Sequence, residues 1–196
     1  MVKRGVAEAF CATGYPVAYV PNRAPQTPAI HKQSLGPGLH FGVFASPFWR
    51  KNVVTQLLSL GLVAGAVGHV MVRPSVDYLA SIDIIEHGEL PWEEFIVIQG
   101  SVDINLYVTL TECHPLSPVE SYLMGVPCLT SRTSWLFKED QELWELTTVD
   151  RPDEPAAIAE AAQTLLDSTA DAVARARIWI RNADEAAKSA WEAFVR

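Results

Sequence analysis

Between residues 39 and 166, short apolar runs alternate with segments of helical periodicity, and this alternation constrains the fold more than any other feature of the sequence. The apolar runs predict strands at 39–45, 64–72, 83–86, 104–111, 126–130 and 146–149. The periodic segments predict helices at 52–60, 76–81, 91–99, 118–124 and 155–166. Strands and helices that alternate with short connections form parallel sheets with right-handed crossovers. The sequence therefore predicts an α/β fold with a doubly wound, Rossmann-like parallel sheet of five or six strands.

The regions on either side of this alternation have different patterns. Residues 1–22 combine helical spacing with a short apolar run near their end, which predicts a terminal helix and strand. Residues 23–38 are rich in proline and glycine without periodicity, so we expect a loop or linker there. The Rossmann-like domain is expected over residues 39–169, and residues 170–196 predict a C-terminal helical tail.

Composition excludes several classes of protein. The net charge of −8 argues against a nucleic-acid partner, because phosphate backbones require a basic face. No apolar run approaches the ~20 residues of a membrane-spanning helix, and no signal-peptide pattern is present, so we expect no integral membrane segment. The three cysteines have no paired spacing, which fits a reducing compartment better than a disulfide framework or a zinc knuckle. We expect a cytoplasmic protein.

In open parallel sheets ligands bind beyond the carboxyl ends of the strands, so the loops after strands are the candidate sites. One of them opens the stretch ECHPLSPVESYLMGVP, residues 112–127. Within it, Ser117 precedes a proline and stands three residues before Glu120, which is the pattern of a capping box. The pattern predicts the start of a helix, and this could be its whole role. The same helix start also offers unpaired backbone N–H groups at the positive end of the helix dipole, where a diphosphate could bind.

Two basic residues follow the first predicted strand of the regular region. Arg50 and Lys51 are expected to open the next helix, where the dipole disfavours positive charge. They could be a solvated pair. They could also face the same anion as the 112–120 loop, since a guanidinium and an ammonium both suit phosphate oxygens.

The spacing in the 112–127 segment resembles a known family signature. A glutamate, seven residues, a second glutamate and a helix ending in Gly-x-Pro are typical of the donor-binding domain of retaining glycosyltransferases with the GT-B fold, of the group 1 or family 4 type. The positions that match are Glu112, Glu120, Gly125 and Pro127. The basic pair at 50–51 also matches, as does the Pro-Asn element at 21–22, where the chain of such enzymes crosses between domains.

The resemblance implies roles for three residues at the reacting centre. Glu112 would face the transferred sugar, where its carboxylate could accept hydrogen bonds from sugar hydroxyls or stabilise positive charge at the anomeric carbon. Arg50 and Lys51 would neutralise the departing nucleoside diphosphate, which stabilises the transition state more than the ground state. No metal and no other cofactor is implied, because the cations and the helix terminus take that place.

The resemblance also implies which residues bind the donor, a nucleotide-diphosphate sugar. Ser117 and its neighbour Leu116 would give backbone N–H groups to the diphosphate, and Glu120 would bind the ribose hydroxyls. The residues expected to bind the donor are Leu116, Ser117, Glu120, Pro115, His87 and Gly88.

Members of this family have two domains and roughly twice this length. The resemblance thus implies that the acceptor-binding domain is missing or lies on a separate chain, and that this chain alone does not transfer sugar. Two alternatives stay open. One is half of a nucleotide-sugar epimerase, which shares the architecture; the other is a non-catalytic binding or scaffold module that kept the fold.

Overall fold

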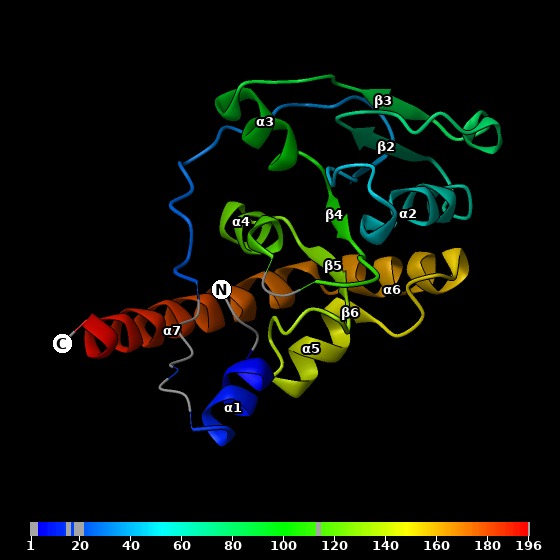
Figure 1. Cartoon of the computed structure of the whole chain (residues 1–196). Helices are drawn as coiled ribbons and strands as arrows, with labels where there is room; N and C mark the ends of the chain where they lie inside the picture. Colours follow the sequence, from blue (N-terminus) through cyan, green and yellow to red (C-terminus); the bar gives the residue numbers. More distant parts are fainter. Residues whose placement is uncertain (1–3, 15–16, 18–21, 113–114, 196) are drawn as a thin grey trace.

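The computed structural model describes residues 4–14, 17, 22–112 and 115–195, and its centre is a parallel sheet (Figure 1). Six strands in the described part of the chain pair in the order β3-β2-β1-β4-β5-β6, and every pair is parallel. The strands are β1 Leu39–Gly42, β2 Ala66–Val70, β3 Ile84–Glu86, β4 Ile104–Tyr107, β5 Cys128–Ser131 and β6 Thr148–Val149. The expected doubly wound α/β fold is confirmed. The strand expected near the end of residues 1–22 falls largely outside the described residues.

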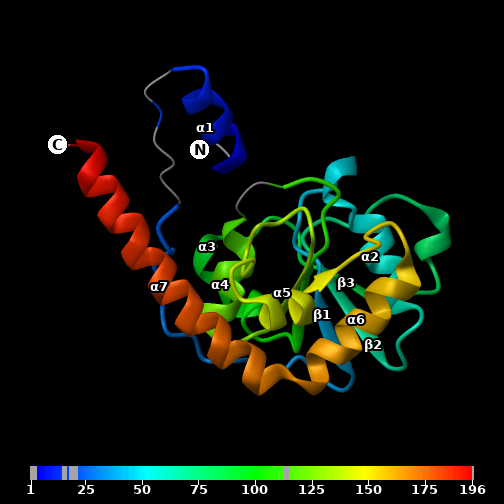
Figure 2. The ribbon, with the colours of Figure 1, turned by 90° about the horizontal axis from the view of Figure 1, so that it is seen from below.

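Helices cover both faces of the sheet. Helices α2 and α6 lie together on one side, and α3 and α4 lie on the other (Figure 1). The helices are α1 Arg4–Ala12, α2 Val53–Leu60, α3 Trp92–Gln99, α4 Leu116–Met124, α5 Gln141–Thr147, α6 Pro155–Asp167 and α7 Thr169–Val195, with 3-10 turns η1 Trp49–Lys51 and η2 Asp77–Leu79. The C-terminal tail is thus a single long helix, which contacts α4, α5 and α6 and extends beyond them (Figure 2).

The core follows from the two-residue alternation of the strands. Phe41 and Leu129 are fully buried and belong to the cluster that also contains Leu57 of α2 and Ile158 of α6. Side chains one position away from such residues point to the opposite face. In β1 this places the buried His40 on the face opposite Phe41, so each face of the sheet is shielded.

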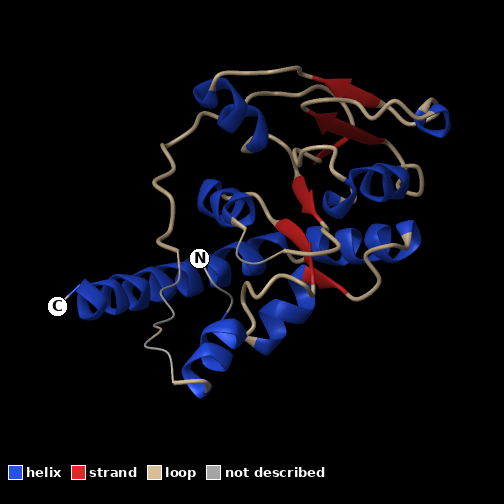
Figure 3. Ribbon diagram, in the orientation of Figure 1, coloured by secondary structure: helices blue, strands red, loops and turns tan. Residues whose placement is uncertain are grey.

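The loop before β1 behaves as its composition indicates. Residues 22–36 contain neither helix nor strand, and the segment runs along one side of the molecule from α7 towards α3 (Figure 3). Arg23 holds it to α7 through an ion pair with Asp184, with Nε and Oδ1 separated by 2.6 Å. In the described part of the chain, no helix has both the length and the apolar character that a bilayer span requires.

Several sequence predictions need correction. The strand expected at 146–149 is only Thr148–Val149, because a helix that was not predicted occupies Gln141–Thr147. Asp140 begins this helix by accepting a hydrogen bond from the Leu143 N–H at 3.1 Å, and Leu143 is buried. The helix expected at 76–81 is a single 3-10 turn. The strands expected at 64–72 and 104–111 are shorter, since their ends belong to the loops.

Candidate active site

The sheet has a topological switch between β1 and β4. The connection after β1 leads outward to β2, whereas the connection after β4 leads in the other direction to β5. The loops that follow these two strands therefore meet at the carboxyl edge of the sheet, where open α/β sheets bind ligands. A hydrogen bond from the Leu110 N–H to the Arg50 carbonyl, 2.9 Å long, joins the two loops directly.

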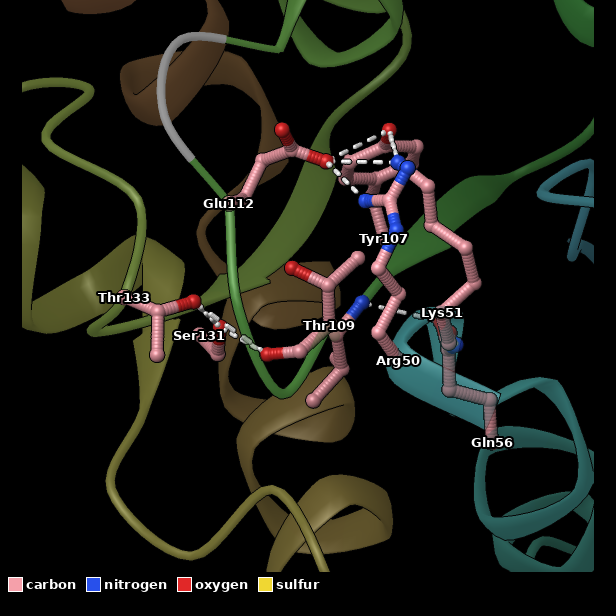
Figure 4. Close-up of polar contacts among 9 residues, drawn as sticks. Arg50, Lys51, Gln56, Tyr107, Thr109, Glu112, Ser131 and Thr133 are labelled. Carbon is pink, nitrogen blue, oxygen red and sulfur yellow. Dashed lines mark hydrogen bonds and ion pairs between the residues drawn. The ribbon is translucent and has the colours of Figure 1, made fainter. Parts of the chain in front are cut away.

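A cluster of charged side chains lies at this junction (Figure 4). The Lys51 ammonium is 2.5 Å from Glu112 Oε2, and Arg50 Nη1 is 3.7 Å from the same oxygen. The side chains of Lys51 and Glu112 are only 11% and 15% exposed, whereas that of Arg50 is 44% exposed. The structure thus brings together the three residues expected at the reacting centre, with a shielded ion pair at the middle and a more open cation beside it.

A short turn, rather than helix α2, presents the two cations. Arg50 and Lys51 lie in η1, and Asn52 separates this turn from α2 in a left-handed conformation with φ 56° and ψ 31°. The expectation that the basic pair opens the helix is therefore wrong. The buried Gln56 fixes the turn to β4, because its Nε2 donates to the Lys51 carbonyl at 2.8 Å and its Oε1 accepts from the Val108 N–H at 2.9 Å.

Sequence reasoning missed Tyr107, the last residue of β4. Its hydroxyl accepts a hydrogen bond from Lys51 Nζ and lies 3.2 Å from Glu112 Oε2. Burial, and after it the nearby Glu112 carboxylate, raises the pKa of the Tyr107 hydroxyl far above its ordinary value. Tyr107 stays protonated at any physiological pH. No sequence signal marked it, because a tyrosine in an apolar strand reads as core.

Hydroxyl groups from the end of β5 support the turn that leads to Glu112. Ser131 Oγ donates to the Thr109 carbonyl at 2.5 Å, and Thr133 Oγ1 lies 2.8 Å from Ser131 Oγ (Figure 4). Ser131 is the last residue of β5, and Thr133 lies in the loop that follows this strand. They hold the carboxyl end of β4 towards β5 rather than contact the charges themselves.

Helix α4 begins two residues earlier than the capping-box pattern indicates. Pro115, with φ −72° and ψ 136°, is the N-cap, and no side chain caps the helix. The predicted capping role of Ser117 is therefore wrong, because the extended Pro115 already ends the loop and Ser117 lies inside the first turn. A helix leaves its first four N–H groups without intrahelical partners, and two of these four positions are prolines. The remaining donors of that turn are the N–H groups of Leu116 and Ser117, the two residues expected to bind a diphosphate.

Glu120 lies one turn further along α4 and is half-buried. Burial raises the pKa of its carboxyl group. It is therefore a carboxylate held in a partly dry environment, the setting in which a hydrogen bond to a ligand hydroxyl is strong.

His87 and Gly88 follow β3 at the same edge of the sheet, but they are farther from the charged cluster. β3 is separated from β1 by β2, so the structure does not bring these two residues to Lys51 and Glu112. His87 Nε2 is instead 2.9 Å from His69 Nδ1, while Gly88 turns the chain with φ 73°. In the described residues, no group of three or more His, Cys, Asp and Glu side chains is arranged to hold a metal ion.

Comparison with known proteins gives a result at the level of structure only. No protein-family model matches the sequence, and no curated protein matches it. The catalytic domain of cholesterol-alpha-glucosyltransferase from Helicobacter pylori aligns with a TM-score of 0.60 and 12% identity, over 75% of this chain and 98% of that chain. The UDP-forming alpha,alpha-trehalose-phosphate synthase from Burkholderia xenovorans, in complex with glucose-6-phosphate, aligns with a TM-score of 0.61 and 14% identity. Sucrose-phosphate synthase from Thermosynechococcus elongatus aligns with a TM-score of 0.54 and 18% identity.

The coverage of these alignments defines what they show. This chain spans 43% of the trehalose-phosphate synthase and 42% of the sucrose-phosphate synthase, while 81% and 80% of its own length is covered. At such low identity the comparison shows the fold. The expected resemblance is confirmed at that level: the chain has the Rossmann-like fold found in GT-B glycosyltransferases.

Proposed function

We propose that this chain is the donor-binding half of a glycosyltransferase that transfers a sugar, with retention, from a nucleotide-diphosphate sugar. The observation that carries the proposal is the convergence of Arg50, Lys51 and Glu112 at the switch point of a fold shared with sugar-transferring enzymes. This ion pair lies at the edge where open α/β sheets bind ligands, and charged groups gathered at such a place are candidates for a functional site.

In this proposal the two cations receive the leaving group. Negative charge grows on the departing diphosphate, and preorganised positive charge stabilises the transition state more than the ground state. An ammonium has three N–H donors, and Lys51 uses two of them on Tyr107 and Glu112. The third can reach a phosphate oxygen, and the exposed Arg50 adds a planar fork. The N–H groups of Leu116 and Ser117 would complete the cradle.

The carboxylates have different tasks in the same scheme. Glu112 is held beside the cations, so it would lie next to the bond between sugar and diphosphate and face developing positive charge on the sugar. Glu120 would accept hydrogen bonds from the ribose, and His87 with Gly88 would lie near the base. The acceptor site would belong to a second domain, since this chain spans less than half of the two synthases. We expect binding of donor without transfer by this chain alone.

Isothermal titration with UDP, GDP and ADP tests the proposal. We expect one nucleotide to bind, and we expect Lys51→Ala and Arg50→Ala each to weaken its affinity by about tenfold or more, because each removes a charge-assisted hydrogen bond. Arg175→Ala is a matched control, since Arg175 pairs with Asp140 and Glu142 away from the cluster and should leave affinity unchanged. Lack of heat with all three nucleotides would instead favour the non-catalytic module.

A further inference from the structure

Tyr107 stands between the cation and the carboxylate of the candidate site. Lys51 Nζ donates to its hydroxyl oxygen and also lies 4.6 Å from the centroid of its ring. The hydroxyl is 3.2 Å from Glu112 Oε2, the oxygen that Lys51 also contacts. One side chain therefore touches both members of the ion pair, through its hydroxyl and through its ring (Figure 4).

The direction of each hydrogen bond in this triangle follows from the groups themselves. An ammonium only donates and a carboxylate only accepts. The tyrosine oxygen must therefore accept from Lys51, and its single proton must point to Glu112. The triangle is consistent only with a protonated Tyr107, which agrees with the raised pKa of this buried phenol.

This arrangement matters when an anion arrives. A diphosphate that binds the third N–H of Lys51 draws the ammonium away from Glu112, and a shielded carboxylate whose hydrogen bond to a donor weakens carries a desolvation penalty. The Tyr107 hydroxyl does not depend on Lys51 and can keep its bond to Glu112 while the ammonium turns to the phosphate. The position of the carboxylate is then retained at the moment when the sugar is beside it.

We propose that Tyr107 is a positioning residue of the donor site, whose hydroxyl holds the Glu112 carboxylate towards the transferred sugar when Lys51 engages the diphosphate. The inference rests on the proposed function and assigns to Tyr107 an effect on the sugar part of the donor. It predicts that removing the hydroxyl reduces recognition of the sugar, while affinity for the nucleoside diphosphate itself changes little.

The test compares affinities for a nucleoside diphosphate and for its sugar derivative. Titrations use the pairs UDP and UDP-glucose, GDP and GDP-mannose, and ADP and ADP-glucose on the unchanged protein, on Tyr107→Phe, on Glu112→Gln and on the double variant. Phenylalanine keeps the ring under Lys51 and removes one hydroxyl. The ratio compared is the dissociation constant of the nucleoside diphosphate divided by that of its sugar derivative. We expect this ratio to fall by roughly threefold to tenfold in Tyr107→Phe, as for loss of one hydrogen bond, because only the sugar derivative binds more weakly.

The double variant decides whether Tyr107 acts through Glu112. If it does, adding Tyr107→Phe to Glu112→Gln changes the ratio no further. Tyr122→Phe is the matched control, because Tyr122 also loses one buried hydrogen bond, to the Cys128 carbonyl at 3.0 Å, but lies in the core. If both tyrosine variants lose stability and the ratio stays unchanged, the Tyr107 hydroxyl has only a structural role.

Each outcome bears on a different claim. An unchanged ratio in Tyr107→Phe, or additive effects in the double variant, overturns the role of Tyr107 while the proposed function stands. A ratio that is insensitive to Glu112→Gln overturns the role of Glu112 and with it that of Tyr107. Failure of the unchanged protein to bind any of the six compounds overturns the proposed function itself.

Discussion

Two shielded polar clusters lie at the sheet, and they are built in opposite ways. At the carboxyl ends of β1 and β4, Lys51 and Glu112 form an ion pair that is joined by the Tyr107 hydroxyl. Arg50 lies beside this pair and is exposed to solvent. Across β1, β2 and the end of β3, His40, His69 and His87 form a chain of rings with 2.9 Å between the facing nitrogens at each of its two steps. We call the first the ion cluster and the second the histidine chain.

The histidine chain can be satisfied without any charge. His40 Nε2 is 3.3 Å from the Gly36 carbonyl, and since a carbonyl only accepts, this nitrogen carries a proton. The other His40 nitrogen then accepts from His69 Nε2, and His69 Nδ1 accepts from His87 Nε2. All three rings are neutral in this pattern. Neither of the two contacts between rings needs an additional proton or a bound ligand.

The contrast teaches where function is to be sought. A buried network that satisfies itself contributes to stability and specificity of packing. An ion pair removed from water gains little stability over an apolar pair, so its retention at a ligand-binding edge favours a role in binding. The comparison therefore predicts that variants of His40 and His69, the two buried members of the histidine chain, mainly change the free energy of unfolding, and that variants in the ion cluster mainly change ligand affinity.

The largest expected effect is on stability, from His69→Ala. The side chain is 1% exposed and makes both hydrogen bonds of the chain, so the variant loses them and leaves a cavity. We expect the free energy of unfolding to fall by about 3–4 kcal/mol. Urea unfolding followed by circular dichroism measures it, with the exposed His31→Ala as the control. A loss below about 1 kcal/mol would break the comparison, because the histidine chain would then contribute no more than a surface residue.

The next effect is the pH dependence of stability. Burial, and after it the neighbouring His87 and His40, lowers the pKa of His69 to about 4. An unfolded histidine titrates near 6.5, so between these two values the unfolded state binds a proton that the folded state does not. The free energy of unfolding therefore decreases as pH falls from about 6.5 to about 4, by about 2–3 kcal/mol from this residue.

The variant His69→Gln isolates that contribution. Glutamine is polar but does not titrate, so the difference in stability between the variant and the unchanged protein should shrink as pH falls through this window. A difference that stays constant from pH 7 to pH 4 would show that His69 takes up a proton as readily in the folded protein as in the unfolded chain, and would contradict a neutral His69 in this window.

Local patterns predicted the fold, and pairing across strands limited what they could reveal. Alternation of strand and helix was sufficient for a parallel sheet. Position after a strand made Arg50 and Lys51 candidates, and the family resemblance was needed to assign a role to Glu112. The histidine chain was invisible, because it depends on the register that pairs Gly42 with His69 and places His40 two positions from that pair. No periodicity in one segment contains this information.

The same limit explains the errors at the site. Tyr107 acquires its role only because η1 delivers Lys51 to its hydroxyl, which is a tertiary contact. The start of α4 was misplaced because two local patterns predict a helix start, the Ser-Pro-x-Glu pattern and the extended Pro115. The helix begins directly after Pro115, which comes before the serine in the chain. Helix α5 did carry a local signal, Asp140 at its N-cap, but the threonines and valine after it favoured a strand.

Glu120 gives the smallest expected effect and tests the boundary between the two kinds of region. It lies in the proposed site, yet burial raises the pKa of its carboxyl group and so favours the neutral form. Burial also favours the neutral form of His69, by lowering its pKa. If it binds ribose hydroxyls as a carboxylate, Glu120→Gln should reduce the preference for UDP over 2′-deoxy-UDP by about threefold, since a neutral acceptor replaces a charged one.

The pH dependence of this preference decides the state of Glu120. Because its pKa is raised, the carboxylate takes up a proton at a higher pH than an exposed glutamate, so the preference for ribose should weaken on acidification in the unchanged protein but not in Glu120→Gln. Paired titrations with both nucleotides across mildly acidic pH measure it, and the exposed Glu160→Gln on α6 is the matched control. The preference for UDP over 2′-deoxy-UDP could instead be independent of pH in the unchanged protein and remain in Glu120→Gln. Glu120 would then be structural, like the histidine chain, and the ligand-binding region would end at the first turn of α4.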